Sequence, residues 1–383
     1  MNDITIDKTG WKKWRFDEVC RQVNTSSKDP VADGLDHVIG LEHIEPGNLH
    51  ITKWDTLEKE TTFTRKFVKG QVLFGRRRAY QRKVAYAEFA GICSGDILVF
   101  EAIEEKLIPE LLPFLIQSDG FFEKALATSA GSLSPRTKFK ELADYEFLLP
   151  PKSEQKRLAE LLWAADEMIE KEKKELEKIT ELYEHKVDSL FSDKKKISFE
   201  ECANINVKSL SAKTSSEYKF HYIDIASIIS PKHLGPLTEY TFSEAPSRAR
   251  RIVSNNDIVL SLVRPYLKSF VQIIKGQNDL IASTGTAVVS AKPNNDTDFL
   301  FHMLFSKAFM AFCENRMNGT NYPAITPGDL EDFKIPMYSY DQQVIISGEL
   351  NLLDKAVERI EKQILLSQQI KQELINMSFP KKG

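Results

Sequence analysis

One apolar pattern occurs twice in this chain and constrains its fold more than any other feature. Between Gln155 and Phe191, apolar residues recur at alternating steps of three and four, interrupted once at Glu172, with no Gly or Pro. This spacing is typical of the narrow seam of a coiled coil. Adding 188 to these residue numbers gives the same seam near the end of the chain. We therefore expect two long helices that bury their seams on each other. The predicted seam residues are Leu158, Leu162, Ile169, Leu176, Ile346, Leu350, Leu353, Val357, Ile360 and Ile364.

The match between the two halves extends well before the helices. At the same offset of 188, identical residues pair without a gap. The pairs are Leu112 and Leu300, Ser118 and Ser306, Phe121 and Phe309, Gly131 and Gly319, Pro135 and Pro323, Leu142 and Leu330, Asp144 and Asp332, and Gln155 and Gln343. Because chance rarely aligns Gly, Pro and a heptad seam together, we interpret the chain as an internal duplication. The alternative is two unrelated domains that each end in a helix.

Each copy combines strand and helix patterns before its long helix. We expect strands at 38–44, 67–74 and 97–100 in the first copy and at 222–228, 252–260 and 287–289 in the second. Gly70 and Asn255-Asn256 supply tight turns, and helices are expected over 109–130 and 298–317. The predicted fold is therefore mixed α/β (α+β), with two globular domains and two long helices that form an antiparallel coiled coil. The expected boundaries are 1–152, 153–192, 193–340 and 341–383.

Composition favours a soluble cytoplasmic protein. A chain of 383 residues can form two or three domains, and 42% hydrophobic with 28% charged residues is ordinary for globular proteins. The four cysteines are widely spaced, which predicts buried thiols in a reducing compartment. The first ten residues lack the pattern of a signal peptide, and no stretch approaches the roughly 20 apolar residues that cross a bilayer.

Basic residues gather in equivalent places of both copies, although the net charge is −3. Between Arg65 and Lys83 there are eight basic residues and no acidic ones. The segment 78–82 aligns with 264–268, and each of these two segments contains a tyrosine between basic residues. Lys and Arg neutralise phosphates, and a guanidinium group can also contact guanine edges. The duplicated cluster therefore predicts DNA binding; the alternative is ordinary surface charge at solvated strand ends.

A loop framed by Gly and Pro occurs in both copies, at 131–138 and 319–326. The frame is retained while the residues inside it differ, as two reading heads of different specificity would require. A plain connection between helix and strand is the alternative. With these loops, the candidate DNA-binding residues are Arg76, Arg77, Arg78, Tyr80, Arg82, Lys83, Arg136, Lys138, Arg248, Arg250, Arg251, Arg264, Tyr266, Lys268, Asn321 and Tyr322.

A search for catalytic motifs is mostly negative. The chain has no Walker A loop and neither the FxGxG nor the (Asn/Asp)-Pro-Pro-aromatic motif of DNA methyltransferases. Asp96 with Glu104-Glu105-Lys106 can be matched to the acidic residues and lysine of a nuclease site. Such combinations are common in any sequence rich in Lys and Glu. The seven histidines, His43 and His185 among them, show no metal-ligand spacing. Charged residues within 167–178 are interpreted as solvated flanks of the coil. We predict no catalytic residue and no metal site.

The order of these motifs along the chain, and their duplication, resemble those of the specificity subunits of type I restriction-modification systems. The resemblance rests on Trp11–Cys20, the segment 70–80, the Gly–Pro loop before Leu142 and Asp144, and the run Leu-Leu-Pro-Pro-Lys-Ser-Glu-Gln at 148–155. In the second copy the run keeps Gln343 but has Tyr338 where the first has Pro150. The start of the second helix therefore departs from the pattern.

The resemblance implies two target recognition domains, each of which binds one half of a bipartite double-stranded DNA site. The helices would space these domains and dock two modification (methyltransferase) subunits, which carry S-adenosylmethionine. A restriction (motor-nuclease) subunit would complete the complex, and this chain would be non-catalytic. A helix of about 37 residues spans roughly 55 Å, more than one DNA turn of about 34–36 Å. The alternatives are a self-contained DNA-modifying or DNA-cleaving enzyme with an unrecognised active site, and a coiled-coil adaptor that does not bind DNA.

Overall fold

The computed structural model describes residues 6–58, 61–129, 134–192, 194–230, 232–273, 276, 278–319 and 321–380. The chain forms two compact units, Met1–Lys173 with Lys362–Gly383, and Lys174–Glu361. Two long helices, α5 (Lys152–Ser189) and α10 (Tyr340–Ser378), each contribute to both units. Within the described residues, no helix combines the length and the apolar character needed to cross a membrane.

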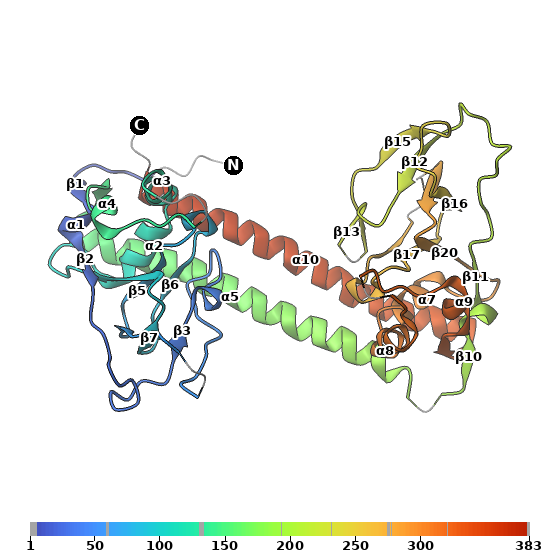
Figure 1. Ribbon diagram of the computed structural model, residues 1–383, viewed down its shortest axis with the longest axis horizontal. Coiled ribbons are helices and arrows are strands. Elements are labelled where there is room, and N and C mark those ends of the chain that lie inside the picture. Colours follow the sequence, from blue (N-terminus) through green and yellow to red (C-terminus); the bar gives the residue numbers. More distant parts are fainter. Residues whose placement is uncertain are drawn as a thin grey trace. The chain divides into compact units, whose positions relative to one another are not determined.

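The first unit contains two sheets and a strand pair (Figure 1). The antiparallel sheet is ordered β2 (Cys20–Val23), β8 (Ile97–Ala102), β5 (Val72–Gly75) and β6 (Val84–Tyr86). In the other sheet, β7 (Gly91–Cys93) pairs with β3 (Val38–Ile39) in parallel and with β4 (Arg65–Phe67) in antiparallel. Strand β1 (Lys12–Arg15) pairs with β9 (Glu146–Leu149). The helices are α1 (Phe16–Val19), α2 (Leu112–Gln117), α3 (Asp119–Ala127) and α4 (Phe139–Leu142), with 3-10 turns η1 (Leu41–His43), η2 (Ala79–Gln81) and η3 (Pro109–Leu111).

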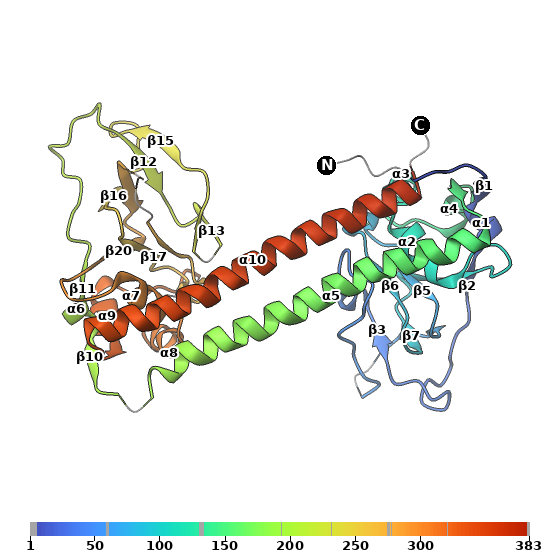
Figure 2. The same ribbon diagram turned by 180° about the vertical axis from the view of Figure 1, so that it is seen from behind.

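The second unit repeats this plan (Figure 2). Its antiparallel sheet is ordered β11 (Ala203–Ile205), β20 (Thr286–Ala291), β17 (Ile258–Ser261) and β18 (Phe270–Gln272). Its other sheet is ordered β15 (Thr238–Thr241), β12 (Lys219–Ile223), β19 (Leu280–Ser283) and β16 (Ala249–Val253), with β12 parallel to β19. The remaining elements are β10 (Lys196–Ser198) paired with β21 (Lys334–Pro336), the hairpin β13 (Ile228–Ser230) and β14 (His233–Leu234), the helices α6 (Phe199–Cys202), α7 (Thr297–Met303), α8 (Lys307–Arg316) and α9 (Pro327–Asp332), and the turn η4 (Pro265–Leu267).

One sheet of each unit lies near the long helices and the other lies farther away (Figures 1 and 2). We call them the proximal sheet (β2-β8-β5-β6 and β11-β20-β17-β18) and the distal sheet (β3-β7-β4 and β15-β12-β19-β16). Because side chains alternate along a strand, each proximal sheet supports two cores. In β8, Phe100 packs in a cluster with Leu162 of α5 and Ile375 of α10, whereas Val99 packs in a cluster with Phe67 of β4. The predicted mixed α/β fold with two globular domains and two long helices is confirmed.

The long helices pair in antiparallel orientation within each unit. In the first unit, Asp166 of α5 contacts Lys371 of α10, and Glu172 accepts a hydrogen bond from Ser367, so numbering rises on one helix as it falls on the other. In the second unit, Lys186 forms an ion pair with Glu349. All ten predicted seam residues are buried or half-buried. The sequence-based interpretation of 167–178 as solvated is wrong for Glu172, whose residue is only 6% exposed.

A glutamine begins both long helices in the same way. The side-chain amide of Gln155 donates to the carbonyl of Pro150 at 3.0 Å, and that of Gln343 donates to the carbonyl of Tyr338 at 3.0 Å. In both cases the amide oxygen accepts a backbone N–H from 47 residues earlier in the chain. The exchange of Pro150 for Tyr338 is tolerated because the glutamine uses only the backbone carbonyl at that position. The second helix therefore starts as the first does.

The turn residues in the sequence predicted the positions of the turns correctly, whereas the predicted ends of several strands differ from the structure. Gly70 and Asn256 have left-handed φ values of +92° and +70° between the predicted strands, which confirms both turns. The predicted strand 38–44 is wrong beyond Ile39, where η1 follows after one residue. The predicted strand 222–228 ends at Ile223. Backbone pairing to neighbouring strands, rather than the apolar run itself, decides where these strands stop.

The predicted helices over 109–130 and 298–317 are each broken into shorter segments. The break lies at Ser118 in the first unit and at Ser306 in the second. Each serine Oγ accepts a hydrogen bond from the N–H of a phenylalanine three residues later, Phe121 at 3.3 Å and Phe309 at 3.1 Å. Serine in this position starts a new helix, and it does so identically in both copies.

Substitution of Gln155 tests the contribution of this buried amide. Gln155→Ala leaves the backbone N–H of Ile108 and the carbonyls of Pro150 and Lys106 without their partner. We expect the free energy of unfolding of the first unit to fall by about 2–4 kcal/mol, measured by urea denaturation. Lys156→Ala, an exposed change on the next residue of α5, is the matched control and should stay within about 0.5 kcal/mol. Equal effects of the two substitutions would contradict this account.

Candidate nucleic-acid interface

A short turn that displays a tyrosine follows the same proximal strand in each unit. We call Arg78–Arg82 and Arg264–Lys268 the tyrosine turns; each contains a 3-10 turn, η2 or η4. The basic residues at both ends have left-handed backbones, with φ of +54° and +53° in the first turn and +49° and +51° in the second. Such conformations cost about 1–3 kcal/mol each in residues other than glycine. The same cost occurs four times at equivalent positions, and Tyr80 and Tyr266 remain 58% and 45% exposed.

The first Gly–Pro loop is hydrogen-bonded to the first tyrosine turn. The N–H of Arg78 donates to the carbonyl of Pro135 at 2.9 Å, and the N–H of Thr137 donates to the carbonyl of Arg76 at 3.1 Å. Residues 131–133 of this loop lie outside the described residues. The two segments that the sequence singled out separately therefore form one surface in the first unit.

The second unit joins its turn and loop with the same pair of hydrogen bonds. The N–H of Arg264 donates to the carbonyl of Pro323 at 2.8 Å, and the N–H of Ile325 donates to the carbonyl of Leu262 at 3.0 Å. Residue 320 of this loop lies outside the described residues, and Gly319 before it has a left-handed φ of +99°. Backbone bonds retain the frame whatever the side chains are, which allows the side chains to differ.

Asp96 organises the arginines of the first unit. Its carboxylate contacts Arg136 Nε at 2.7 Å and Arg77 at 3.4 Å. Burial by itself raises the pKa of Asp96, but the hydrogen bond and charge of Arg136, aided by Arg77, bring the pKa below its ordinary value. Burial, aided by the neighbouring charge of Arg65, lowers the pKa of Arg76. Sequence reasoning considered Asp96 only as a nuclease carboxylate, whereas the structure uses it to hold two guanidinium groups.

Two further predicted DNA-binding residues in the first unit, Arg82 and Lys83, also have internal partners. Arg82 forms an ion pair with Asp119 at 2.7 Å and lies 4.5 Å from the ring centroid of Phe122. Lys83 Nζ donates to the carbonyl of Leu41 at 2.6 Å. These contacts hold both side chains against the globular part of the first unit, and the prediction that they bind DNA stays a prediction. Among the described residues of this surface, the exposed side chains are those of Arg78, Tyr80, Arg136 and Lys138.

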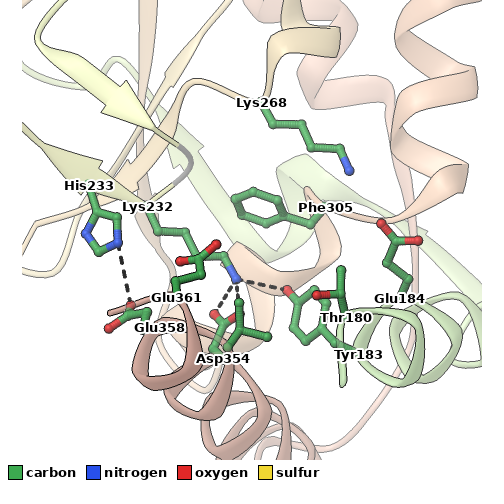
Figure 3. A pocket seen from close by; sticks show the side chains of 11 residues that line it. Thr180, Tyr183, Glu184, Lys232, His233, Lys268, Phe305, Asp354, Glu358 and Glu361 are labelled. Carbon is green, nitrogen blue, oxygen red and sulfur yellow. Dashed lines mark hydrogen bonds and ion pairs between the residues drawn. The ribbon is translucent and has the colours of Figure 1, made fainter. Parts of the chain in front are cut away.

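In the second unit the turn and the loop share an arginine. Arg264 lies 5.0 Å from the ring centroid of Tyr322 and donates to the carbonyl of Asn321 at 2.9 Å. Tyr322 is exposed, as is Tyr266 of the turn. Lys268 is half-buried and faces the long helices rather than the loop (Figure 3). The second surface is therefore aromatic, with one guanidinium group stacked on a tyrosine.

The remaining predicted arginines belong to the distal sheet of the second unit. Arg250 and Arg251 lie in β16, and Arg248 immediately precedes it. Arg250 stacks 5.1 Å from the ring centroid of Phe242, and Arg251 donates to Ser209 Oγ at 3.3 Å. The tyrosine turn, in contrast, follows a proximal strand. The structure therefore places these arginines on a separate sheet from Arg264.

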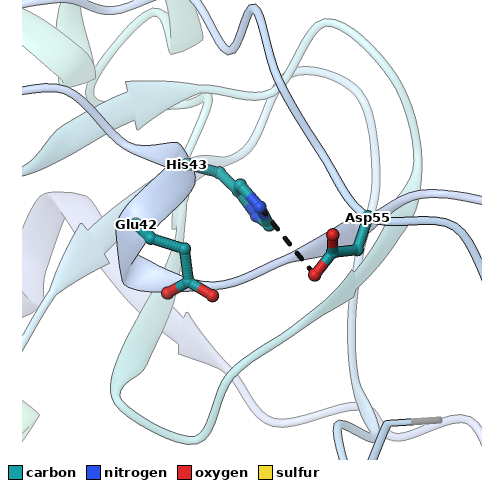
Figure 4. Close-up of side chains that lie close together, drawn as sticks. All are labelled: Glu42, His43 and Asp55. Carbon is teal, nitrogen blue, oxygen red and sulfur yellow. Dashed lines mark ion pairs between the residues drawn. The ribbon is translucent and has the colours of Figure 1, made fainter. Parts of the chain in front are cut away.

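Glu42, His43 and Asp55 form a cluster that could be mistaken for a metal site (Figure 4). Their ligand atoms lie within 4.8 Å of one another, a proximity that sequence spacing did not reveal. However, the backbone N–H of Gly40 donates to His43 Nδ1 at 3.0 Å. The neutral ring therefore carries its proton on Nε2, the nitrogen that faces Asp55 at 4.0 Å. A metal-bound histidine normally donates from its second nitrogen, so this hydrogen-bond pattern does not fit metal binding.

Comparison with known proteins assigns the family. A family model described as the type I restriction modification DNA specificity domain matches residues 8–181 and 192–372. The chain belongs to this family. The two matches cover both copies of the duplication, and the predicted resemblance is confirmed.

The chain is similar to one curated protein and to solved structures at low sequence identity. The type I restriction enzyme EcoDI specificity subunit of Escherichia coli is 26% identical over 167 residues, which span 42% of this chain and 37% of that protein. The S subunit of a type I restriction-modification system from M. genitalium covers 100% of this chain and 98% of its own, with 16% identity and a TM-score of 0.59. A structure described as concerning complex assembly and conformational transition of the type I R-M system covers 96% and 97%, with 18% identity and a TM-score of 0.57.

The contrast between Arg82 and Arg78 is testable through stability. Arg82→Ala removes the ion pair with Asp119 and the contact with Phe122, so we expect a loss of about 1–2 kcal/mol in the free energy of unfolding. Arg78→Ala removes an exposed side chain and should change stability by less than about 0.5 kcal/mol. Chemical denaturation of both variants measures this difference. A larger loss for Arg78→Ala would reverse the two roles.

Proposed function

We propose that this chain is the DNA-recognition subunit of a type I restriction-modification complex, in which each unit binds one half of a bipartite DNA site. The observation that carries the proposal is the duplicated surface made by a tyrosine turn and its Gly–Pro loop. Both copies retain the backbone, including the strained ends of the turn. Strain of this kind is retained where a functional geometry requires it.

The two surfaces differ in chemistry, which supports two different half-sites. The first presents Tyr80 together with guanidinium groups, two of which Asp96 orients. The second presents Tyr266 and Tyr322, with Arg264 stacked on the latter. Oriented guanidinium groups suit phosphates and guanine edges, whereas aromatic rings suit apolar contact with bases. An asymmetric bipartite site follows from this difference.

The long helices carry exposed apolar side chains that support docking of partner subunits. Leu161 and Met168 of α5 are exposed in the first unit, and Ile345 and Leu352 of α10 are exposed in the second. Exposed apolar residues that repeat along a helix mark protein contacts when they form a patch. We propose that the helices dock two methyltransferase subunits, which carry S-adenosylmethionine, and that a restriction subunit completes the complex.

Under this proposal the chain itself is not catalytic and acts in the cytoplasm. All four cysteines are buried and free, as the sequence predicted, which suits a reducing compartment. Methyl transfer and cleavage then belong to the partner subunits. The chain contributes the position at which they act.

Half-site competition tests the tyrosine turns. Tyr80→Ala should relax discrimination at one half-site and Tyr266→Ala at the other, each by about 1–3 kcal/mol. Binding of the chain to duplexes altered in one half-site at a time measures both effects. Arg157→Ala, an exposed arginine on α5, is the control and should leave discrimination unchanged. If either tyrosine variant weakened binding equally on both half-sites, the division of labour would be refuted.

Catalysis by the chain alone is the second test. The purified chain with duplex DNA and S-adenosylmethionine should transfer no methyl groups, and with magnesium it should cut no DNA. Addition of the methyltransferase subunits should restore methylation at the bipartite site. Methylation by the isolated chain would instead favour a self-contained enzyme.

A further inference from the structure

Each unit contains a cavity where its globular part meets the long helices. The cavity in the second unit has a volume of about 280 Å³ and that in the first about 210 Å³. Each is lined by eleven residues, and eight of them correspond between the cavities at the constant offset of 188. For example, Gln117 corresponds to Phe305, and Lys371 corresponds to Tyr183. The two cavities are therefore copies of one site.

An aspartate is retained in both cavities. Asp166 of α5 corresponds to Asp354 of α10 (166 + 188 = 354). The residue Asp166 is only 3% exposed, and the side chain of Asp354 is also largely buried. A buried carboxylate is costly unless a cation pairs with it. Each unit therefore has to supply a positive group at this place.

In the first unit, the globular part supplies His50. Its ring contacts Asp166 through Nε2 at 2.9 Å and Glu88 through Nδ1 at 3.1 Å. The neighbouring carbonyl of Leu49 accepts from the N–H of Tyr86 in β6, which fixes the segment to the edge of the proximal sheet. Since both carboxylates are acceptors, the two contacts form hydrogen bonds together only when both ring nitrogens carry protons, as they do in an imidazolium.

Charged groups near His50 come from the segment after β6 and from both long helices. Glu88 follows β6, Asp166 lies on α5, and Lys371 of α10 contacts the second oxygen of Asp166. The ring of Trp163 lies at 6.3 Å between centroids. The hydrogen bond to Asp166 raises the pKa of His50 above its ordinary value, against the opposing effect of burial.

In the second unit, the globular part supplies Lys232 instead (Figure 3). Its N–H donates to the carbonyl of Phe270 in β18, the counterpart of β6, at 2.8 Å. Its ammonium group contacts the carboxylate of Asp354 and donates to the hydroxyl of Tyr183 at 3.4 Å. It also lies 4.5 Å from the ring centroid of Tyr183 and 4.7 Å from that of Phe305.

Tyr183, which accepts a hydrogen bond from Lys232, is itself the first member of a chain of buried hydrogen bonds. The hydroxyl of Tyr183 is 2.9 Å from His302 Nδ1, and His302 Nε2 is 2.9 Å from Asn351 Oδ1. Asn351 Nδ2 donates to Asp298 at 2.7 Å, so its Oδ1 is an acceptor and His302 Nε2 carries the proton. Burial lowers the pKa of His302, in agreement with a neutral ring. The lysine is thus the cation of this site.

Both cavities lie beside a tyrosine turn. Arg82, the last residue of the first turn, donates to the backbone carbonyl of Gln117 at 3.0 Å, and Gln117 lines the first cavity. Lys268, the last residue of the second turn, lines the second cavity itself. A shift of the globular part at either cavity would therefore displace the adjacent tyrosine turn.

We infer that Asp166 and Asp354 are positioning residues, one for each recognition surface, and that the first pairs with a histidine and the second with a lysine. Beside the second pair, His233 lies 3.9 Å from Glu358 of α10 (Figure 3). Each aspartate anchors a loop of the globular part to the long helices: His50 through Asp166, and Lys232 through Asp354. The consequence for DNA rests on the proposed function, but the anchors themselves do not.

The direction of the pH effect follows from the raised pKa of His50. Its stabilising contribution is fully present below the ordinary histidine value of about 6.5 and is lost as the pH rises through the higher folded value. In the second unit, burial lowers the pKa of Lys232, against the opposing charge and hydrogen bond of Asp354. A cation whose pKa is lowered by folding does not lose stability as the pH rises. Alkaline pH therefore loosens the first anchor without the same effect on the second.

Hydrogen exchange of the intact chain tests the anchors without DNA. Exchange at pH 6 and pH 8.5 is expressed as protection factors, so that the intrinsic pH dependence of exchange cancels. Protection of residues 44–51 should fall between these pH values, by roughly tenfold for each unit by which folding raises the pKa of His50. Protection of residues 228–234 should not show this fall. An equal response of both segments would overturn the inference.

Three variants separate a titrating anchor from general loosening. His50→Lys keeps a cation at every pH and should abolish the fall in protection of residues 44–51. Glu88→Gln alters an exposed carboxylate and should move the fall to lower pH, which keeps the test valid if the lysine variant does not fold. Asp354→Asn should reduce protection of residues 228–234 at both pH values. A pH response of His50→Lys identical to that of the unmodified chain would refute the assignment.

Half-site binding completes the test. The affinity ratio between duplexes intact in the first and in the second half-site should shift with pH in the unmodified chain and stay constant in His50→Lys. If neither protein bound DNA, the proposed function would fail while the exchange result stood. If exchange showed no pH effect while half-site binding was normal, the inference alone would fail.

Discussion

Leu162 of α5 and Ile375 of α10 are fully buried in the core of the first unit, and Val187 and Leu350 of the same helices are buried in the core of the second. Burial of a side chain of this size contributes about 1.5–3 kcal/mol. Long helices with charged outer faces gain most of their stability from such packing. Because helices and globular parts share these cores, each recognition surface depends on the helix pair.

The duplication retained backbone geometry more strictly than side chains. The tyrosine turns keep left-handed residues at both ends, and the Gly–Pro loops keep the same pairs of backbone hydrogen bonds. Side chains on this frame changed freely, from Arg136 and Lys138 in one copy to Ala324 and Thr326 in the other. A frame held by main-chain bonds can accept new side chains without refolding, which is what two different half-sites require.

Buried residues that contact each other in one copy of the duplication are replaced together in the other copy. In the first unit the rings of Phe114 and Trp163 pack at 5.1 Å between centroids. At the offset of 188 the second unit has His302 and Asn351, which form a hydrogen bond of 2.9 Å. Either polar residue alone would be left without its partner, at a cost of about 1–3 kcal/mol. The apolar pair and the polar pair are therefore exchanged as wholes, and the polar pair supports the Lys232 anchor.

Periodicity and local turn chemistry by themselves determined the duplication, the two long helices, the inward seam and the turns at Gly70 and Asn256, because those signals act within a few residues. Only the tertiary structure decided which charges serve the fold. It gave Arg82 and Lys83 internal partners, and it placed His50 and Lys232 on equivalent aspartates although 182 rather than 188 residues separate them (232 − 50 = 182). Loops of unequal length hide such pairs from an alignment, since a charge finds its partner through space and not along the chain.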